Sequence, residues 1–222
     1  MFKIILQCMV LIYIILIVYY IIDLQKFNIN GLIIDTSDTE EVKENAFKLN
    51  PVLFYNQSLF NINDPKLNYL QDINNYKNNH PSFVFKNNEL FERINIPSLT
   101  LDTSFIHGSH FHFPIQHSIT IIKGKNSIPL KKCIHNHNII GVLEGSSTIY
   151  LFIPKHKDEI INKENDEIKK WGHKKLIQKG NVLLIPPYWS YIQEIEEGII
   201  QYHTDIDTYF TFIPNLLKEI YS

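Results

Sequence analysis

The stretch from Gly180 to Trp189, GNVLLIPPYW, constrains the fold more than any other part of the sequence. A glycine opens it, four large apolar residues follow, and two consecutive prolines then precede an aromatic pair. A short apolar run bounded by Gly and Pro is typical of a buried strand, and neither proline can donate a hydrogen bond to a continuing ladder. The sequence therefore predicts a buried strand over 182–185 that ends abruptly and projects Tyr188, Trp189 and Tyr191 from its end.

Short β-type runs dominate the chain after Phe105. They lie close together, and turn-forming residues such as Glu144-Gly145-Ser146 separate them. Many short strands at close spacing are typical of a sandwich or a barrel. The predicted strands are Val52–Tyr55, Ser118–Ile122, Asn138–Leu143, Thr148–Ile153, Val182–Ile185, Ile199–His203 and Tyr209–Ile213.

A few helices are expected beside these strands. Ser37-Asp38-Thr39-Glu40 has the form of a capping box and predicts a helix to about Leu49. The helix ends there because Asn50 precedes a proline, which pushes it out of helical conformation. Three other segments carry weaker patterns: 155–172 is strongly charged and predicts an exposed helical insertion, 215–221 predicts a short terminal helix, and 56–95 predicts loops with one or two short helices.

The segment from Ile4 to Ile22 is almost wholly apolar, with Gln7 as its only strongly polar side chain. About 20 apolar residues suffice for a helix to cross a bilayer, and Tyr19-Tyr20 occupy the place of an interfacial aromatic belt. No small-x-small cleavage site follows, which favours an uncleaved signal-anchor over a signal peptide. The alternative is a buried core helix or strand pair.

The chain is therefore expected to be a single-pass membrane protein whose membrane partner is contacted through residues 4–22. We divide it into a transmembrane signal-anchor at 1–24, a linker at 25–36 and one globular domain at 37–222. The few charges that flank the apolar segment do not fix which side of which membrane the domain occupies.

Charge and cysteine content exclude several classes of function. A net charge of -2 provides no basic face for nucleic acid, so we expect no nucleic-acid partner. Cys8 lies in the apolar segment and Cys133 in the domain, which leaves neither a disulfide framework nor a thiolate metal site. The sequence also contains no Gly-x-Ser-x-Gly elbow and no glycine-rich phosphate loop.

Several motifs together resemble the cupin-like, Jumonji-C-type family. Asn138 lies seven residues before the turn glycine Gly145, and the next strand ends in Leu-Phe-Ile-Pro at 151–154. The stretch 180–189 is similar to the family's Gly-Asp-x-Leu-x-Ile-Pro-x-x-Trp, Asn50-Pro51-Val52 to its opening strand, and Ile96-Pro97-Ser98-Leu99 to its pre-barrel segment. The resemblance covers roughly residues 37 to 214. It implies a mainly β fold, a double-stranded β-helix (cupin or jelly-roll) barrel with a few flanking helices, beside the N-terminal transmembrane helix.

Active members of this family are Fe(II)- and 2-oxoglutarate-dependent oxygenases, but this chain departs from the family at the positions that carry the chemistry. The family's His-x-Asp pair falls on Lys132 and Ile134, and its distal His falls on Tyr191. The lysine that pairs with 2-oxoglutarate falls on Ser147. An ammonium and an isoleucine cannot complete the facial triad of Fe(II).

We therefore expect a non-catalytic binding or structural module with no catalytic residue, no cofactor and no metal at the family's positions. Its partner is an unidentified protein or small-molecule ligand. The candidate pocket consists of Lys132, Asn138, Trp189 and Tyr191.

Two alternatives are open. A relocated metal site could use His135, His137 and His203, because His-x-His on a strand places both rings on one face. The chain would then be an oxygenase that uses Fe(II) and 2-oxoglutarate. The other alternative is an unrelated β-sandwich attached to a membrane. The further histidines at 107, 110, 112 and 117 are interpreted as a surface loop.

Overall fold

The computed structural model describes residues 2–26, 33–55, 83–87, 112–161, 163–209, 211–212 and 215. Its helices are α1 (Phe2–Lys26), α2 (Thr39–Phe47), α5 (Lys157–Ile160) and α6 (Asn165–Ile168), with the 3-10 turns η4 (Pro154–His156) and η5 (Lys169–Trp171). Its strands are β1 (Ile34–Thr36), β2 (Val52–Tyr55), β3 (Phe83–Asn87), β4 (His112–Lys123), β5 (Asn126–Lys132), β6 (His137–Phe152), β7 (His173–Gln178), β8 (Asn181–Ile185), β9 (Ser190–Ile195) and β10 (Gly198–Thr208).

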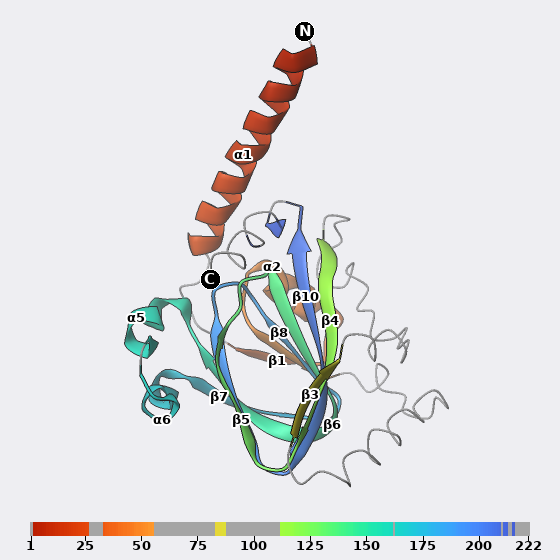
Figure 1. Cartoon of the computed structure of the whole chain (residues 1–222), viewed down its shortest axis with the longest axis vertical. Coiled ribbons are helices and arrows are strands. Elements are labelled where there is room, and N and C mark those ends of the chain that lie inside the picture. The colour runs from red at the N-terminus through yellow and green to blue at the C-terminus, as the bar shows by residue number, and fades with distance from the viewer. Residues whose placement is uncertain are drawn as a thin grey trace, which may run out of the picture.

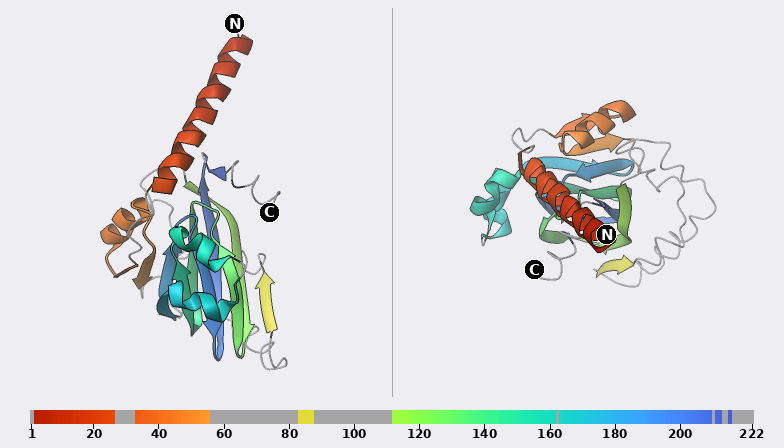
Figure 2. Two further views of the ribbon diagram at one scale, coloured as in Figure 1. Left: turned by 90° about the vertical axis from the view of Figure 1, so that its left-hand side faces the viewer. Right: turned by 90° about the horizontal axis from the view of Figure 1, so that it is seen from above.

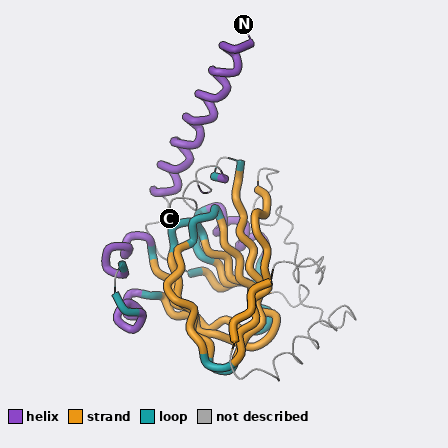
Figure 3. Tube along the Cα trace, in the orientation of Figure 1, coloured by secondary structure: helices purple, strands orange, loops and turns teal. Residues whose placement is uncertain are grey.

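The strands form a jelly-roll barrel (Figures 1 and 3). One sheet has the order β8-β6-β10-β4, extended at its edges by β1-β2 and by β3. The other has the order β7-β6-β9-β5. Because β4 continues into β5 and β9 into β10, the chain alternates between the sheets as a double-stranded β-helix does. The expectation of a mainly β fold with a few helices is confirmed.

Strand β6 takes part in both sheets. Its first half, up to Gly145, pairs with β8 and β10, and its second half pairs with β7 and β9. Gly145 has φ +83 and closely approaches the carbonyl oxygen of Gly198, a conformation that L residues rarely adopt. The prediction of two strands separated by a turn at 144–146 is therefore wrong, because the glycine bends the strand from one sheet into the other without reversing it.

Between the sheets lies the main hydrophobic core. It joins residues of the first sheet, such as Ile140 and Leu183, to residues of the second, such as Ile149 and Ile177. A separate core covers the outer face of the first sheet, where Val42 and Ala46 of α2 pack. In α2 the N-cap is Asp38, which accepts a hydrogen bond from the backbone of Glu40, so the helix begins one residue later than a cap at Ser37 would place it.

The charged segment 154–172 forms the short helices between β6 and β7 (Figure 2). Ile160 and Ile168 are buried against Phe152 and Ile192, the outer face of the second sheet. The prediction of a helical insertion is confirmed. The prediction that the insertion is exposed is wrong for Ile160 of α5 and Ile168 of α6, because these two side chains form a small separate core with the second sheet.

Strands β5 and β7 were not predicted. The apolar pattern of β5 is weakened by Pro129 and by the two lysines at the end of the strand, and that of β7 by its own lysines. An edge strand tolerates both proline and lysine. The register of β5 on β9 shifts around Pro129, between Ile128 and Lys131.

Other strand boundaries also differ from the predictions. Strand β3 replaces part of the predicted loop region 56–95, and Ile34–Thr36 of the predicted linker pairs in parallel with β2. Strand β9, Ser190–Ile195, was likewise not predicted. The predicted strand over 209–213 is wrong for its described residues, which form a turn and a helical residue. Ile96–Leu99, His107 and His110 lie outside the described residues, as does 216–221 of the predicted terminal helix.

Helix α1 projects from one end of the barrel (Figure 1). Its apolar side chains face solvent, as Ile4, Met9 and Tyr19 do with 65%, 63% and 68% exposure, so the alternative of a buried core helix is wrong. Among the helices of the described residues, none is long and apolar enough to cross a membrane. The structure thus confirms the helix without supporting the prediction that it spans a bilayer.

Candidate functional site

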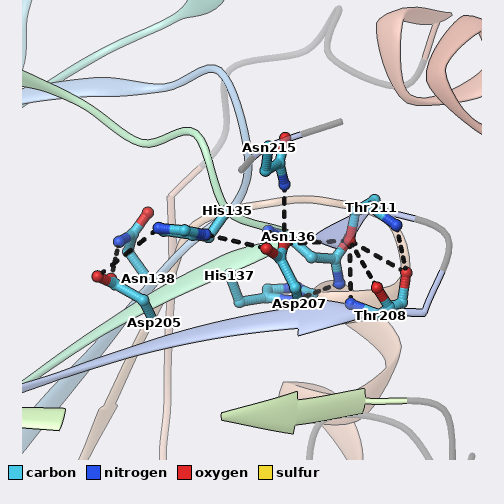
Figure 4. Close-up of polar contacts among 9 residues, drawn as sticks. All are labelled: His135, Asn136, His137, Asn138, Asp205, Asp207, Thr208, Thr211 and Asn215. Atoms are coloured by element: carbon cyan, nitrogen blue, oxygen red, sulfur yellow. Dashed lines mark hydrogen bonds and ion pairs between the residues drawn. The ribbon is translucent and has the colours of Figure 1, made fainter. Parts of the chain in front are cut away.

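A polar cluster occupies one end of the barrel (Figure 4). It lies where the start of β6 pairs with the last part of β10. On β10 the polar residues Gln201, His203 and Asp205 alternate with Tyr202 and Thr204. Alternate residues of a strand point to the same face, and Tyr202 belongs to the outer core. The three polar side chains therefore face the barrel interior.

Asp207 is the structural centre of this cluster. Its side chain is fully buried and accepts hydrogen bonds from His135 Nδ1 at 3.0 Å and from the backbone amide of Asn136 at 2.8 Å. Thr211 Oγ1 donates at 3.0 Å and Asn215 Nδ2 at 2.8 Å. Four donors around one buried carboxylate fasten the segment after β10 to the loop before β6, because such charge-assisted bonds are stronger than neutral ones.

Asp205 lies on the same strand, but a register shift separates it from Ile206. It pairs with Asn138 of β6, whose amide nitrogen donates a hydrogen bond to its Oδ1. Its Oδ2 lies 3.9 Å from His135 Nε2, and its side chain is 14% exposed. The side chain of Asp205 is therefore close to His135 and is not fully buried.

The amide oxygen of Asn138 is buried and has no hydrogen-bond partner among the described residues. Figure 4 shows this oxygen pointing away from the carboxylate of Asp205. Turning the amide around would bring its oxygen against the carboxylate, so the network fixes the orientation. A buried acceptor without a donor costs about 1–3 kcal/mol, which marks this position as one that a donor group would stabilise.

A second network lies deeper in the barrel and includes His203. Gln193 Nε2 donates to Ser147 Oγ and to Gln201 Oε1, both at 2.7 Å. Gln201 Nε2 donates to Gln193 Oε1 at 3.1 Å and to His203 Nε2 at 2.9 Å. Because an amide nitrogen can only donate, His203 Nε2 is the acceptor of this hydrogen bond.

The turn after β8 closes the barrel beside this cluster. The backbone of Cys133 donates to the carbonyl of Trp189 at 2.8 Å, and the backbone of Tyr188 donates to the carbonyl of Cys133 at 2.8 Å. Tyr188 has φ 69, an uncommon conformation for a bulky residue. Lys132 Nζ lies 5.7 Å from the centre of its ring, within the distance of a cation–π contact.

Two acidic groups near Asp205 are held neutral by burial. Burial raises the pKa of the Cys133 thiol well above its usual range, and Asp205 raises it further while Lys131 opposes the effect. Burial also raises the pKa of Tyr191, with Cys133 and Asp205 adding to the shift. A desolvated thiol or phenol keeps its proton because the charged form is disfavoured in a nonpolar environment.

The structure does not place the four residues of the predicted pocket in similar environments. Trp189 and Tyr191 are 1% and 2% exposed and belong to the core between the sheets. Asn138 is buried beside Asp205. Lys132 is exposed at the end of β5. The described residues do place Asn138 and Tyr191 near the same acid, Asp205. The pocket itself stays a prediction.

The relocated histidines are likewise divided among different partners. His135 donates to Asp207 and His203 accepts from Gln201. His137 Nδ1 accepts a hydrogen bond from Asn136 Nδ2 at 2.9 Å. No three His, Cys, Asp or Glu side chains of the described residues are grouped so as to hold a metal ion.

Asp205 and Asp207, which organise this end of the barrel, are not among the predicted site residues. A signal was present: polar residues recur at every second position from Gln201 to Asp207 within an otherwise apolar strand. That period of two predicts a polar face in a buried strand. The predicted strand ends at His203, whereas β10 continues to Thr208 and so includes both acids.

Comparisons with known proteins leave the family open. No family model matches the chain, and no curated protein matches it. Among solved structures, the chain resembles the CENP-C cupin domain of Drosophila melanogaster at 10% identity and TM-score 0.29, covering 39% of this chain and 57% of that one. It also resembles the Schizosaccharomyces pombe Cnp3 cupin domain (13% identity, TM-score 0.33, covering 50% of this chain and 64% of that one).

A third similar structure is an RmlC-like cupin from Shewanella frigidimarina, at 13% identity and TM-score 0.32, covering 47% of this chain and 73% of that one. All three are described as cupin domains. The strand order of this barrel defines a jelly roll. At these TM-scores the likenesses carry no argument about function.

Proposed function

We propose that the chain is a jelly-roll binding or structural module without oxygenase chemistry, attached to a membrane through α1. The observation that carries the first part is the environment of Tyr191. The resemblance to the Jumonji-C-type family requires a metal-binding histidine there, and the chain instead has a tyrosine that is 2% exposed within the core. A protonated phenol packed among apolar side chains is a poor ligand for Fe(II).

The other positions of the family's site do not fit iron and 2-oxoglutarate either. Lys132 is exposed and lies over the ring of Tyr188, and Ile134 has no ligand atom in its side chain. Ser147 accepts a hydrogen bond from Gln193 and cannot supply the positive charge that pairs with the 2-oxoglutarate carboxylate. The residues at these positions therefore do not form the family's iron and cosubstrate site.

The full chain, purified in detergent and supplied with Fe(II) and ascorbate, tests this part of the proposal through succinate formation from 2-oxoglutarate. We expect no turnover above a protein-free control. Succinate formation that a His135→Ala change abolishes would favour the competing function, an oxygenase with a relocated histidine site.

Membrane attachment is proposed from the surface of α1. Its large apolar side chains are exposed from Ile4 to Tyr19, except on the face of Tyr13 and Ile17, which are half-buried. Such a continuous apolar surface on a soluble protein marks a contact with a partner or a lipid phase. The hydroxyl of Tyr13 donates to the backbone carbonyl of Tyr209, beyond the end of β10. An apolar helix held beside one end of the barrel is suited to bring that end to a bilayer.

Fractionation of cells that express the full chain tests the attachment. We expect the chain to stay in the membrane pellet after extraction at alkaline pH, and a chain with Ile12→Lys and Ile15→Lys in α1 to move to the supernatant. Recovery of the unchanged chain in the supernatant would contradict membrane attachment without bearing on the absence of oxygenase chemistry.

A further inference from the structure

We propose that the end of the barrel from which α1 projects binds the anionic headgroup layer of a lipid bilayer, with Trp171 at the membrane–water boundary. The inference deepens the proposed function and rests on it, because it names the lipid class and the second surface with which an attached module would contact a membrane. It is carried by exposed lysines at this end of the second sheet, by the exposed ring of Trp171 among them, and by the position of α1.

The strand register brings several basic segments to one end of the second sheet. The end of β5 pairs with the start of β9 through Lys132 and Ser190, and the end of β6 pairs with the same start through Phe152. The start of β7 pairs with β6 through His173 and Leu151. The ends of β5 and β6 and the starts of β7 and β9 therefore lie at one end of the barrel.

Helix α1 leaves the barrel at the same end. Residues 186–189 join the end of β8 to the start of β9, and the ends of β8 and β10 both pair with the start of β6. Tyr209, the residue after β10, accepts a hydrogen bond from the hydroxyl of Tyr13 in α1. Figure 1 shows α1 projecting from this end. The apolar helix and the basic segments are thus on one side of the molecule.

Exposed lysines surround this end of the second sheet, and we call them the basic rim. They are Lys131 and Lys132 of β5, Lys155 of η4, Lys157 of α5, Lys170 of η5 and Lys174 of β7. Because they come from three strands and from the insertion between β6 and β7, they are spread along the end of the sheet. Such an arrangement suits a broad anionic surface better than a single anionic group.

The lysines of the basic rim outnumber the carboxylates at this end. These carboxylates are Asp158 and Glu159 of α5 and the largely buried Asp205 and Asp207 of β10. The pairs Lys48–Glu44, Lys169–Glu194 and Lys175–Asp35 contribute no net charge. The other carboxylates of the insertion belong to α6 and its N-cap, and Figures 1 and 2 show α6 farther from α1 than α5 is. The end is therefore positive even when every histidine is neutral.

Trp171 lies among these charges as an exposed aromatic side chain. It is 39% exposed, its ring centre lies 5.3 Å from that of His156, and Lys170 Nζ lies 5.8 Å from its ring centre. The pKa of His173 is lowered, first by burial and then by the positive charge of His156 and of two nearby lysines. Tryptophan favours the headgroup level of a membrane, and lysines beside it are attracted to anionic lipids.

An anionic bilayer fits this surface better than an acidic protein does. The basic rim and the apolar surface of α1 lie at the same end, so one lipid phase can contact both at once. A positive segment beside a membrane anchor is attracted by the negative surface potential of anionic lipids. That attraction weakens as salt is added, because the screening length shortens.

Fluorescence quenching by a lipid-attached probe tests the proposal. The chain has two tryptophans, and Trp189 is only 1% exposed, so the signal from lipid contact reports on Trp171. The full chain is reconstituted into phosphatidylcholine vesicles that carry a spin label near the headgroup, with and without phosphatidylserine. We expect stronger quenching with phosphatidylserine than without, and loss of this difference in about 1 M salt, where the screening length is about 3 Å.

Charge reversal at the two ends of the barrel provides the matched comparison. Lys155→Glu combined with Lys170→Glu changes the basic rim and is expected to abolish the effect of phosphatidylserine. Lys125→Glu combined with Lys179→Glu changes the net charge equally at the other end, where Lys125 precedes β5 and Lys179 follows β7, and should keep the effect. All four lysines are exposed, and circular dichroism checks that each variant folds.

Several results would overturn the proposal: equal quenching with and without phosphatidylserine, a difference that the Lys155→Glu, Lys170→Glu variant keeps, or quenching that a Trp171→Phe variant keeps. A response of Trp171 to soluble polyglutamate without one to phosphatidylserine would assign the surface to an acidic protein and would also overturn it.

Flotation of the same samples separates this inference from the proposed function. A chain that floats with pure phosphatidylcholine vesicles but does not respond to phosphatidylserine retains attachment through α1 and contradicts lipid binding by the basic rim. A chain that floats only with vesicles containing phosphatidylserine supports binding by the basic rim and contradicts attachment through α1.

Discussion

Asp205 and Asp207 lie two positions apart on β10, and their carboxylates have very different surroundings. Asp207 is fully buried and is held by His135, the backbone of Asn136, Thr211 and Asn215. Asp205 is partly exposed and accepts a hydrogen bond from the amide nitrogen of Asn138. The amide oxygen of Asn138 has no partner among the described residues. The register shift between Asp205 and Ile206 separates the two environments. A saturated carboxylate of this kind stabilises the fold, whereas an unsaturated one is available to a ligand.

The largest expected effect is on stability, from Asp207→Ala. Four buried donors lose their acceptor at once, and breaking a buried charged pair costs about 3–5 kcal/mol. We expect a loss of this size in the free energy of unfolding, measured by urea denaturation. Asp205→Ala, the same change two residues earlier, is the matched control and should cost much less. Equal losses for the two variants would remove the distinction between the carboxylates.

The next effect is a dependence of stability on pH that originates beside Asp205. Burial raises the pKa of the Cys133 thiol in the folded chain above its ordinary value of 9.0. Above about pH 9 the unfolded chain loses this proton and the folded chain keeps it, so the free energy of unfolding falls by up to about 1.4 kcal/mol per pH unit. Urea denaturation across this range measures the slope.

Cys133→Ala is the control for that slope, because it removes the thiol and leaves Asp205 in place. We expect the decline between about pH 9 and pH 10 to become shallower in this variant, since tyrosines ionise mainly above about pH 10. An identical slope in both chains would show that the thiol is not held neutral in the folded state.

A smaller effect is expected from Thr211→Val, which removes one of the donors to Asp207 without changing the size of the side chain. The change also removes the oxygen that accepts from the backbone amide of Thr208 at 2.9 Å, so two hydrogen bonds are lost, each worth about 1 kcal/mol and somewhat more when the partner is charged. A cycle that combines Thr211→Val with Asp207→Ala measures whether the two changes act through the same bond. If their costs add, the bond between Thr211 and Asp207 contributes nothing.

The smallest expected effect is that of Asp205→Asn on stability, below about 1 kcal/mol, because the new amide oxygen can still accept from Asn138. Urea denaturation beside the unchanged chain measures it. A loss of several kcal/mol would instead give Asp205 a structural role like that of Asp207.

Much of the barrel was predictable from local sequence patterns. The run Val182–Ile185 between Gly180 and Pro186 forms the end of β8 as predicted, and Val52–Tyr55 forms β2. Gly145 shows the limit of such patterns: the residue marks a backbone with positive φ, but the sequence does not say whether the chain reverses or bends into another sheet. That outcome depends on pairing with distant strands.

The candidate site was less predictable, because it is built by long-range pairing. Asn138 and Tyr191 were named from the sequence through a resemblance, but Asp205 meets Asn138 only through the register of β10 on β6. The polar alternation along β10 was visible in the sequence. Which of its acids is saturated depends on Thr211 and Asn215, whose contacts form only in the folded chain.

The central claim is that the barrel interior serves structure and ligand binding without a resident metal. Elemental analysis of the full chain, expressed with added iron and zinc and purified without chelators, tests it most directly. We predict far less than stoichiometric metal, with no change in His135→Ala or His203→Ala variants. Stoichiometric iron or zinc that either variant loses would contradict the account.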